Sequence, residues 1–263
     1  MNLAFAVVIL AHILADFYLQ WNKMAESKEK DFNWVIYHGI EYAVVFGLVL
    51  WVCIPFSIEL FYLWILAALV HYAIDSIKFL IPDEIENQKP FVPWIIGHKF
   101  ILDQCLHFFT LWGFWRLCET NISVKPFIEL KIDYLPAKPI LIILGLLFIL
   151  RPVGILIAKG ELWDFSEKYK GKTEGTFEQN GGKNDKKKQN SGKMIGYLER
   201  VIVFFFLLYN QYSSIAFVLT AKSVARFKEI EQNEMKAEDY LIGTLMSMAF
   251  VFFITLFLGL TGN

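Results

Sequence analysis

Apolar runs of about 20 residues, long enough to span a bilayer as helices, recur along this chain and limit its fold more than any other feature. Hydrophobic residues make up 56% of the 263 residues, more than a water-soluble domain of this length carries. The sequence therefore predicts an all-α, polytopic membrane protein. About seven transmembrane helices are expected, at residues 2–21, 34–56, 59–82, 97–118, 137–158, 198–221 and 238–260.

The runs divide the chain into four predicted regions. Residues 1–118 form a four-helix transmembrane domain, and residues 119–159 contain the fifth span with the loop before it. Residues 160–197 are rich in Lys, Gly and Asn and have almost nothing to bury, which is typical of a flexible loop. Residues 198–263 hold the C-terminal transmembrane segments. The lipid bilayer is therefore the first expected partner.

The lysines of residues 160–197 predict the orientation of the chain, because loops rich in Lys and Arg stay in the cytoplasm. Counting spans back from this loop places residue 1 outside. The basic loop that contains Lys222 and Arg226 then also falls outside, which disagrees with the rule. A break at Asn210–Ser214 that turns the sixth segment back as a re-entrant hairpin would remove this conflict, and it is the alternative to seven simple spans.

Histidines and acidic residues occur in pairs within the first four predicted spans. The pairs are His12–Asp16, His38–Glu41, His71–Asp75 and Asp103–His107. Separations of three or four residues put both side chains on one face of a helix. Because successive spans run in opposite directions, all four pairs fall in the same half of the bilayer, on the predicted cytoplasmic side.

Imidazole and carboxylate groups gathered at one depth indicate a divalent metal site, with zinc the first expectation. The expected ligands are His12, His38, His71, Asp75, Asp103 and His107. Asp16 would orient an imidazole or act as the catalytic base. Two other interpretations stay open, in which the pairs fasten helices to one another or relay protons or ions.

The remaining candidates carry weaker signals. Arg151 and Glu199 fall towards the same membrane side, so they form an ion pair, or Arg151 receives an anionic group such as phosphate. Cys53, Cys105 and Cys118 lack C-x-x-C spacing and are expected to be thiols rather than disulfides. No nucleic-acid partner is expected, and the sequence does not indicate an oligomeric state.

The segments AHILADFYLQ, VHYAIDSIK and LDQCLH resemble the bacterial membrane proteins of domain-of-unknown-function family 3307, over residues 4–118. The segments GYLERVIVFFFLLYNQYSSIAFVLTAKSVARF and AEDYLIGTLMS resemble the C-terminal region of its longer members. The resemblance implies a multi-pass protein of the bacterial inner membrane and carries no activity. The family's His and Asp positions map onto His12, Asp16, His38, His71, Asp75, Asp103 and His107, but not onto Glu41.

A looser similarity, in architecture and ligand type only, links the chain to inner-membrane metal-dependent hydrolases and to seven-span, ceramidase-like hydrolases that hold zinc. We therefore predict a membrane-embedded, metal-dependent hydrolase that acts on a lipid-like substrate, because the site is reached from hydrocarbon. The sequence has no Gly-x-Ser-x-Gly elbow, P-loop or His-Glu-x-x-His motif. The alternatives are a metal-ion or proton transporter that uses the same cluster, and a structural or sensory membrane protein.

Overall fold

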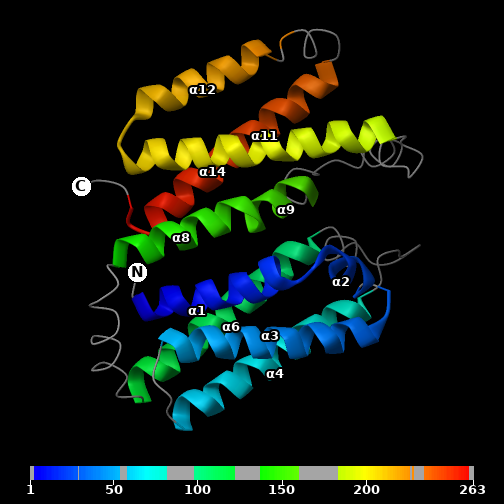
Figure 1. Ribbon diagram of the computed structural model, residues 1–263, viewed down its shortest axis with the longest axis vertical. Helices are drawn as coiled ribbons and strands as arrows, with labels where there is room; N and C mark the ends of the chain where they lie inside the picture. The colour runs from blue at the N-terminus through cyan, green and yellow to red at the C-terminus, as the bar shows by residue number, and fades with distance from the viewer. Residues whose placement is uncertain are drawn as a thin grey trace. The chain divides into compact units, whose positions relative to one another are not determined.

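The computed structural model describes residues 3–28, 30–53, 58–81, 98–121, 137–159, 183–225, 227 and 234–260 (Figure 1). The regular elements within these ranges are helices, so the all-α prediction is confirmed. The chain divides into two compact units, Met1–Leu144 and Gly145–Asn263. The predicted region boundaries at residues 118 and 159 stay predictions.

Helices of the N-terminal unit pack side by side as a bundle. They are α1 (Leu3–Ile13), the π-helical segment η1 (Leu14–Leu19), α2 (Asn22–Ser27), α3 (Phe32–Cys53), α4 (Ile58–Leu80) and α6 (Lys99–Asn121). Helix α1 packs against α3 and α6, and α4 packs against the same two helices (Figure 1). The four long segments therefore close around a common interior.

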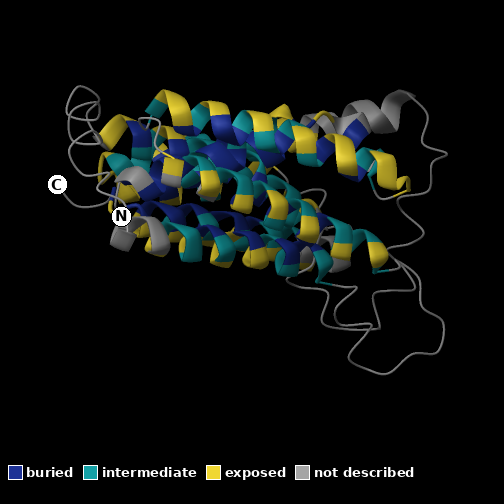
Figure 2. Ribbon diagram, turned by 90° about the horizontal axis from the view of Figure 1, so that it is seen from below, coloured by how far each residue is buried: buried dark blue, intermediate teal, exposed yellow. Residues whose placement is uncertain are grey.

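The two faces of α3 show what drives this packing. Buried positions recur every three or four residues, at Val35, His38, Tyr42, Phe46 and Leu50. The opposite face carries side chains that are 39–69% exposed, at Ile36, Ile40, Val44, Leu48 and Val52. Figure 2 shows the same division, with buried residues inside and exposed residues outside. An apolar outer face of this kind is suited to hydrocarbon rather than to water.

A close approach between α3 and α4 depends on Gly47. A Cβ atom added to this glycine would lie 2.6 Å from Nε1 of Trp64, so a larger residue does not fit without movement. The indole N–H of Trp64 donates to the carbonyl oxygen of Ala43 at 2.8 Å, which holds the ring over the glycine. Small residues commonly allow such approach between transmembrane helices.

The C-terminal unit is also helical. Helix α8 (Ala137–Leu150) runs across the boundary between the units, and the chain continues through α9 (Pro152–Lys159), α11 (Lys183–Leu208), α12 (Tyr212–Ala225) and α14 (Glu234–Phe257). Helix α11 packs against α9, α12 and α14. Residues 183–197, predicted as part of the flexible loop, belong instead to α11, which begins at Lys183. Lysine, which is frequent there, is a good helix former. Residues 160–182 of that loop lie outside the described residues.

Helices α11 and α12 form an antiparallel hairpin. The chain turns at Asn210, whose φ of 56° lies in the left-handed region that asparagine tolerates better than most residues. Lys222, near the end of α12, pairs with Glu199 within α11, so α12 runs back alongside the C-terminal part of α11 (Figure 1). The single straight span predicted at 198–221 is therefore wrong, and the chain breaks within the segment that the alternative prediction named.

Four helices within the described residues are long and apolar enough to cross a membrane, and they indicate a multi-pass membrane protein. They are Phe32–Cys53, Leu60–Leu80, Lys138–Ala158 and Tyr240–Phe257. The prediction of seven such helices is therefore wrong.

Three predicted spans account for the difference. The first corresponds to a shorter apolar helix, Phe5–Leu19. The fourth corresponds to α6, in which Lys99, Asp103, His107 and Arg116 interrupt the apolar residues. The sixth is divided by the turn between α11 and α12.

Candidate metal centre

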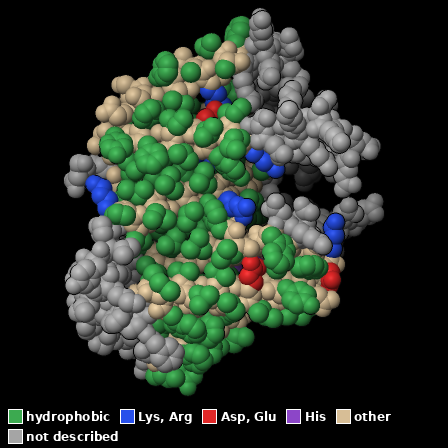
Figure 3. All heavy atoms as spheres, viewed as in Figure 1, with side chains coloured by type: hydrophobic (Ala, Val, Ile, Leu, Met, Phe, Trp, Pro, Cys, Tyr) green, Lys and Arg blue, Asp and Glu red, His purple; other side chains and the backbone are tan. Residues whose placement is uncertain are grey.

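The predicted site residues of the first four spans all lie inside the N-terminal bundle. His12 lies on α1, Asp16 on η1, His38 on α3, His71 and Asp75 on α4, and Asp103 and His107 on α6. None of these residues is more than 6% exposed. On the face drawn in Figure 3, hydrophobic side chains dominate, and no described histidine is visible. Burying so many ionisable groups is costly unless they pair or bind an ion.

Six of the seven residues come within reach of one another. Ligand atoms lie within 4.8 Å in three sets: His12, Asp16 and His107; Asp16, His38 and His71; and His71, Asp75 and His107. Because each set shares a residue with the others, they form one continuous buried cluster. The cluster is a group that could hold a metal ion, and the role of each residue as a ligand stays a prediction.

Close contacts join His38, His71 and Asp75, which we call the α3–α4 triad. Nε2 of His38 lies 3.4 Å from Nε2 of His71 and 3.4 Å from Oδ2 of Asp75. Nε2 of His71 lies 3.8 Å from the same oxygen. Tetrahedral zinc with bonds of about 2.0–2.2 Å needs ligand atoms about 3.3–3.6 Å apart. The three atoms therefore nearly match one face of a zinc tetrahedron.

The π-helical turn of η1 sets the direction of Asp16. Such turns are rare and occur often at functional sites. Oδ1 of Asp16 lies 3.1 Å from Nε2 of His38, whereas Oδ2 lies 4.0 Å from Nε2 of His12. The four-residue spacing predicts that Asp16 pairs with His12 on one helix face. The carboxylate instead faces both α1 and α3, with its shorter contact to α3.

Two lysines neutralise carboxylates of the cluster. Nζ of Lys28 donates to Oδ2 of Asp75 at 3.2 Å, and Nζ of Lys78 donates to Oδ2 of Asp103 at 2.6 Å. Among the described residues, Asp103 belongs to none of the three ligand sets. Its Oδ1 lies 3.7 Å from Nδ1 of His107. The structure thus places Asp103, a predicted metal ligand, in an ion pair beside the imidazoles.

Tyr42 is a member of the site that the pattern of charged residues does not reveal. Its ring stacks on His71, with centroids 3.5 Å apart and planes 4° from parallel. Its hydroxyl lies 3.2 Å from Nδ1 of His12. Tyr42 follows His38 by one helical turn, so applying the same spacing rule to aromatic residues would have found it. No such spacing identifies Lys28, because the sequence around it shows only that it is charged.

Several buried polar atoms of the cluster have no hydrogen-bond partner among the residues that the structure describes. They are Nδ1 of His38, Nδ1 of His71, Oδ1 of Asp75 and both ring nitrogens of His107. Oε2 of Glu41 also has no hydrogen-bond partner among these residues, and it lies 3.7 Å from Nδ1 of His38. Because buried polar atoms normally find partners, the cluster has spare capacity for a ligand.

The other predicted residues lie apart from these contacts along the chain. In the C-terminal unit, Glu199 pairs with Lys222, and Arg151 lies between α8 and α9. An anion-receiving role for Arg151 stays a prediction. Cys53 and Cys105 are thiols, as expected, and the side chain of Cys118 lies outside the described residues.

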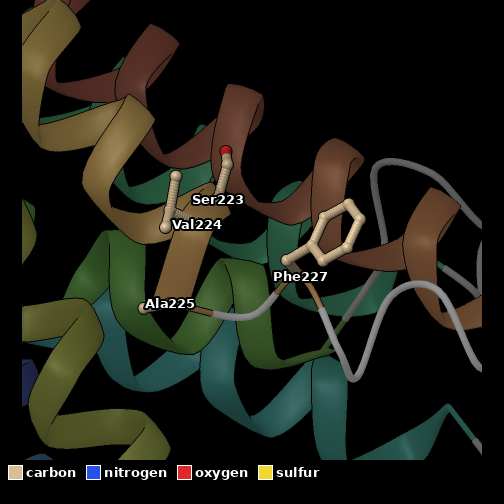
Figure 4. Close-up of a pocket in the computed structure, with 4 residues that line it drawn as sticks. All are labelled: Ser223, Val224, Ala225 and Phe227. Atoms are coloured by element: carbon tan, nitrogen blue, oxygen red, sulfur yellow. The ribbon is translucent and has the colours of Figure 1, made fainter.

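A pocket at the end of α12 offers little chemistry. It is lined by Ser223, Val224, Ala225 and Phe227 (Figure 4). The hydroxyl of Ser223 donates to the carbonyl oxygen of Leu219 at 3.0 Å, so it is already engaged. None of the predicted site residues lines this pocket.

Fold and site together define an all-helical protein with candidate membrane spans and a buried His/Asp cluster. Residues 4–130 match the family described as "Protein of unknown function (DUF3307)". The match includes every residue of the cluster, so the predicted resemblance of the N-terminal half is confirmed. The resemblance of the C-terminal segments lies beyond the matched residues and stays a prediction. No curated protein and no solved structure matches the chain.

Proposed function

We propose that the N-terminal unit binds a divalent metal, preferably zinc, and uses it to hydrolyse a lipid-like substrate in the bacterial inner membrane. The observation that carries the proposal is the spacing of 3.4, 3.4 and 3.8 Å between the ligand atoms of His38, His71 and Asp75. Three protein ligands leave the fourth tetrahedral position for water or substrate, which is the arrangement of catalytic zinc sites.

The surroundings of the α3–α4 triad support this proposal. Ligating side chains are usually oriented by further contacts. Oε2 of Glu41 lies 3.7 Å from the outer nitrogen of His38, and the ring of Tyr42 stacks on His71. Both imidazoles of the triad therefore have a neighbour that can help to orient them.

The hydrolytic role follows from the group next to the triad. A divalent metal polarises a carbonyl or phosphoryl oxygen and lowers the pKa of a bound water. Oδ1 of Asp16 lies 3.1 Å from Nε2 of His38, so its carboxylate would be the base for such a water. The apolar outer faces of the bundle lie in lipid, which favours a lipid-like substrate.

Metal content tests the first part of the proposal. The protein is purified in detergent without a histidine tag and incubated with zinc. We expect bound zinc in the wild type and its loss in His38→Ala and His71→Ala. His98→Ala is the matched control, because His98 is the one histidine of the five that belongs to none of the ligand sets. A wild type that binds no zinc, and whose thermal unfolding zinc does not shift, would overturn the proposal.

Turnover tests the second part. The protein is reconstituted in vesicles of phosphatidylethanolamine and phosphatidylglycerol. We expect release of fatty acid or of a water-soluble headgroup that requires zinc and is lost in Asp16→Asn. Tight zinc binding without any product would contradict the proposed hydrolysis but would still support the proposed metal centre.

A relay is the second candidate function, because contacts cross the whole cluster. They run from Lys28 to Asp75, His38, Asp16, Gln104, Asp103 and Lys78, with steps of 3.2, 3.4, 3.1, 3.1, 3.2 and 2.6 Å. The amide nitrogen of Gln104 donates to both Asp16 and Asp103, so it does not pass a proton between them, and the proton path is confined to Lys28, Asp75, His38 and Asp16. Lys28→Met would cut this path and leave the α3–α4 triad in place. Proton flux in vesicles that disappears in Lys28→Met, with zinc binding retained, would favour the relay.

A further inference from the structure

The cluster contains a second set of ligands beside the α3–α4 triad. His12, Asp16 and His107 have ligand atoms within 4.8 Å of one another, and we call them the α1–α6 triad. It shares no residue with the α3–α4 triad. Two imidazoles and one carboxylate are therefore present twice, once from each pair of helices.

Asp16 lies between the two triads. Its Oδ1 is 3.1 Å from Nε2 of His38, and its Oδ2 is 4.0 Å from Nε2 of His12. One oxygen thus faces each triad, which is the geometry of a bridging carboxylate. The rings of His71 and His107 stack at 4.3 Å between centroids, so the two triads are in direct contact.

The α1–α6 triad also has nitrogen atoms available. His107 is 2% exposed, and neither of its ring nitrogens has a hydrogen-bond partner among the described residues. Nδ1 of His12 lies 3.2 Å from the hydroxyl of Tyr42, while its Nε2 faces Asp16. A histidine oriented through one nitrogen, with the other facing a carboxylate, is typical of a metal ligand.

Resting on the proposed function, we propose that the cluster binds a second divalent cation at the α1–α6 triad; Asp16 then bridges the two ions and no longer serves as the base proposed for the one-ion site. Two-metal sites hold their ions about 3.5–4 Å apart and stabilise both the attacking and the leaving oxygen of a displacement. A phosphoester is therefore the substrate class that this arrangement fits.

The net charge of the cluster determines how tightly a second ion can bind. Four carboxylates, of Asp16, Glu41, Asp75 and Asp103, face two ammonium groups, of Lys28 and Lys78. With neutral imidazoles, one divalent ion makes the cluster neutral and a second leaves it positive. Excess charge in a poorly solvated interior is costly. The second ion therefore binds more weakly and enters with an anion, for which phosphate is the matching probe.

Zinc stoichiometry with and without inorganic phosphate tests the inference. Equilibrium dialysis of the full chain in detergent should give one tightly bound zinc without phosphate and two with it. His12→Ala and His107→Gln should each reduce the phosphate-dependent value from two to one. His98→Ala should keep two. Circular dichroism and size-exclusion chromatography establish that each variant is folded before dialysis.

A manganese probe tests the bridge itself. In the presence of phosphate, electron paramagnetic resonance of the manganese-loaded wild type should show two exchange-coupled ions, and His107→Gln should show one isolated ion. Two uncoupled ions would overturn the bridge.

The outcomes separate the two proposals. One zinc in the wild type under both conditions would overturn the second site and leave the first. No zinc would overturn both. Loss of all zinc in His107→Gln would also overturn the inference, since His107 would then belong to the first site.

Discussion

At the scale of single residues, the ion pair between Lys28 and Asp75 changes what a substitution should do. The sequence alone predicts that Asp75→Asn leaves the metal-free protein as stable or more stable, because a buried negative charge disappears. The ammonium group of Lys28, 3.2 Å from the carboxylate, would then be left without its partner. The structure therefore predicts the opposite sign.

We expect Asp75→Asn to lower the free energy of unfolding, without metal, by about 3 kcal/mol, as for other broken buried pairs. The double variant Lys28→Met, Asp75→Asn should recover most of the loss, because the uncompensated charge is gone. Chemical unfolding in detergent measures both values. An unchanged single variant would show that the pair contributes nothing.

Lys28 should also tune the affinity for zinc. Its ammonium group repels a divalent ion held by Asp75, so we expect Lys28→Met to tighten zinc binding about tenfold, or 1.4 kcal/mol. Lys30→Met, a change at an exposed lysine of the same segment, is the matched control. Isothermal titration measures the affinity, and weaker binding in Lys28→Met would mean that the lysine positions Asp75.

The sequence predicts the buried His/Asp cluster, because residues one turn apart on antiparallel spans lie at one depth; their role as ligands stays a prediction. His38 and His71 come together for this reason. Lys28 could not be found in this way, since nothing local ties a residue of the short segment after η1 to α4. Spacing alone likewise does not predict that Asp103 pairs with Lys78 rather than with His107.

At the scale of elements, the sequence predicts helices but not their irregularities. Apolar runs reveal α3 and α4 because length and composition suffice. The π-helical turn at Leu14–Leu19 is a change of hydrogen-bond register that composition does not encode. The turn at Asn210 is marked only by polar residues in an apolar run, which fit a continuous helix almost as well.

The contact of α3 with α4 at Gly47 gives a prediction at this scale. Gly47→Ala should lower stability by about 1–3 kcal/mol, because the added methyl group collides with the indole of Trp64. Gly113→Ala on α6 is the matched control, since a Cβ there meets none of the described residues within 4 Å. It should leave stability equal or about 0.5–1 kcal/mol higher. Thermal unfolding of both variants measures the difference, and equal melting points would contradict the contact.

At the scale of the whole molecule, the α11–α12 hairpin changes the expected topology. A straight sixth span would carry the chain across the membrane, whereas the hairpin returns it to the side where α11 began. Lys222 then lies on the same side as the lysines at the start of α11, as the charge rule requires. The order of spans alone could not distinguish these paths.

Cysteine labelling tests this topology in a chain without Cys53, Cys105 and Cys118. An impermeant reagent added from outside should not label Phe227→Cys or Ser191→Cys, because both positions are then cytoplasmic. Thr261→Cys, beyond α14, should be labelled. Labelling at Phe227→Cys with none at Thr261→Cys would restore the straight sixth span.

Because Tyr42 stacks on His71, the absorption of this tyrosine should respond to an ion that binds in the cluster. A phenol ring 3.5 Å from an imidazole shares its electronic environment, and its hydroxyl contacts a second histidine of the cluster. An ion that binds either histidine should therefore shift the near-ultraviolet absorption of this tyrosine. The difference spectrum would isolate one chromophore among many, so the speed of ion entry into the bundle can be followed without a label.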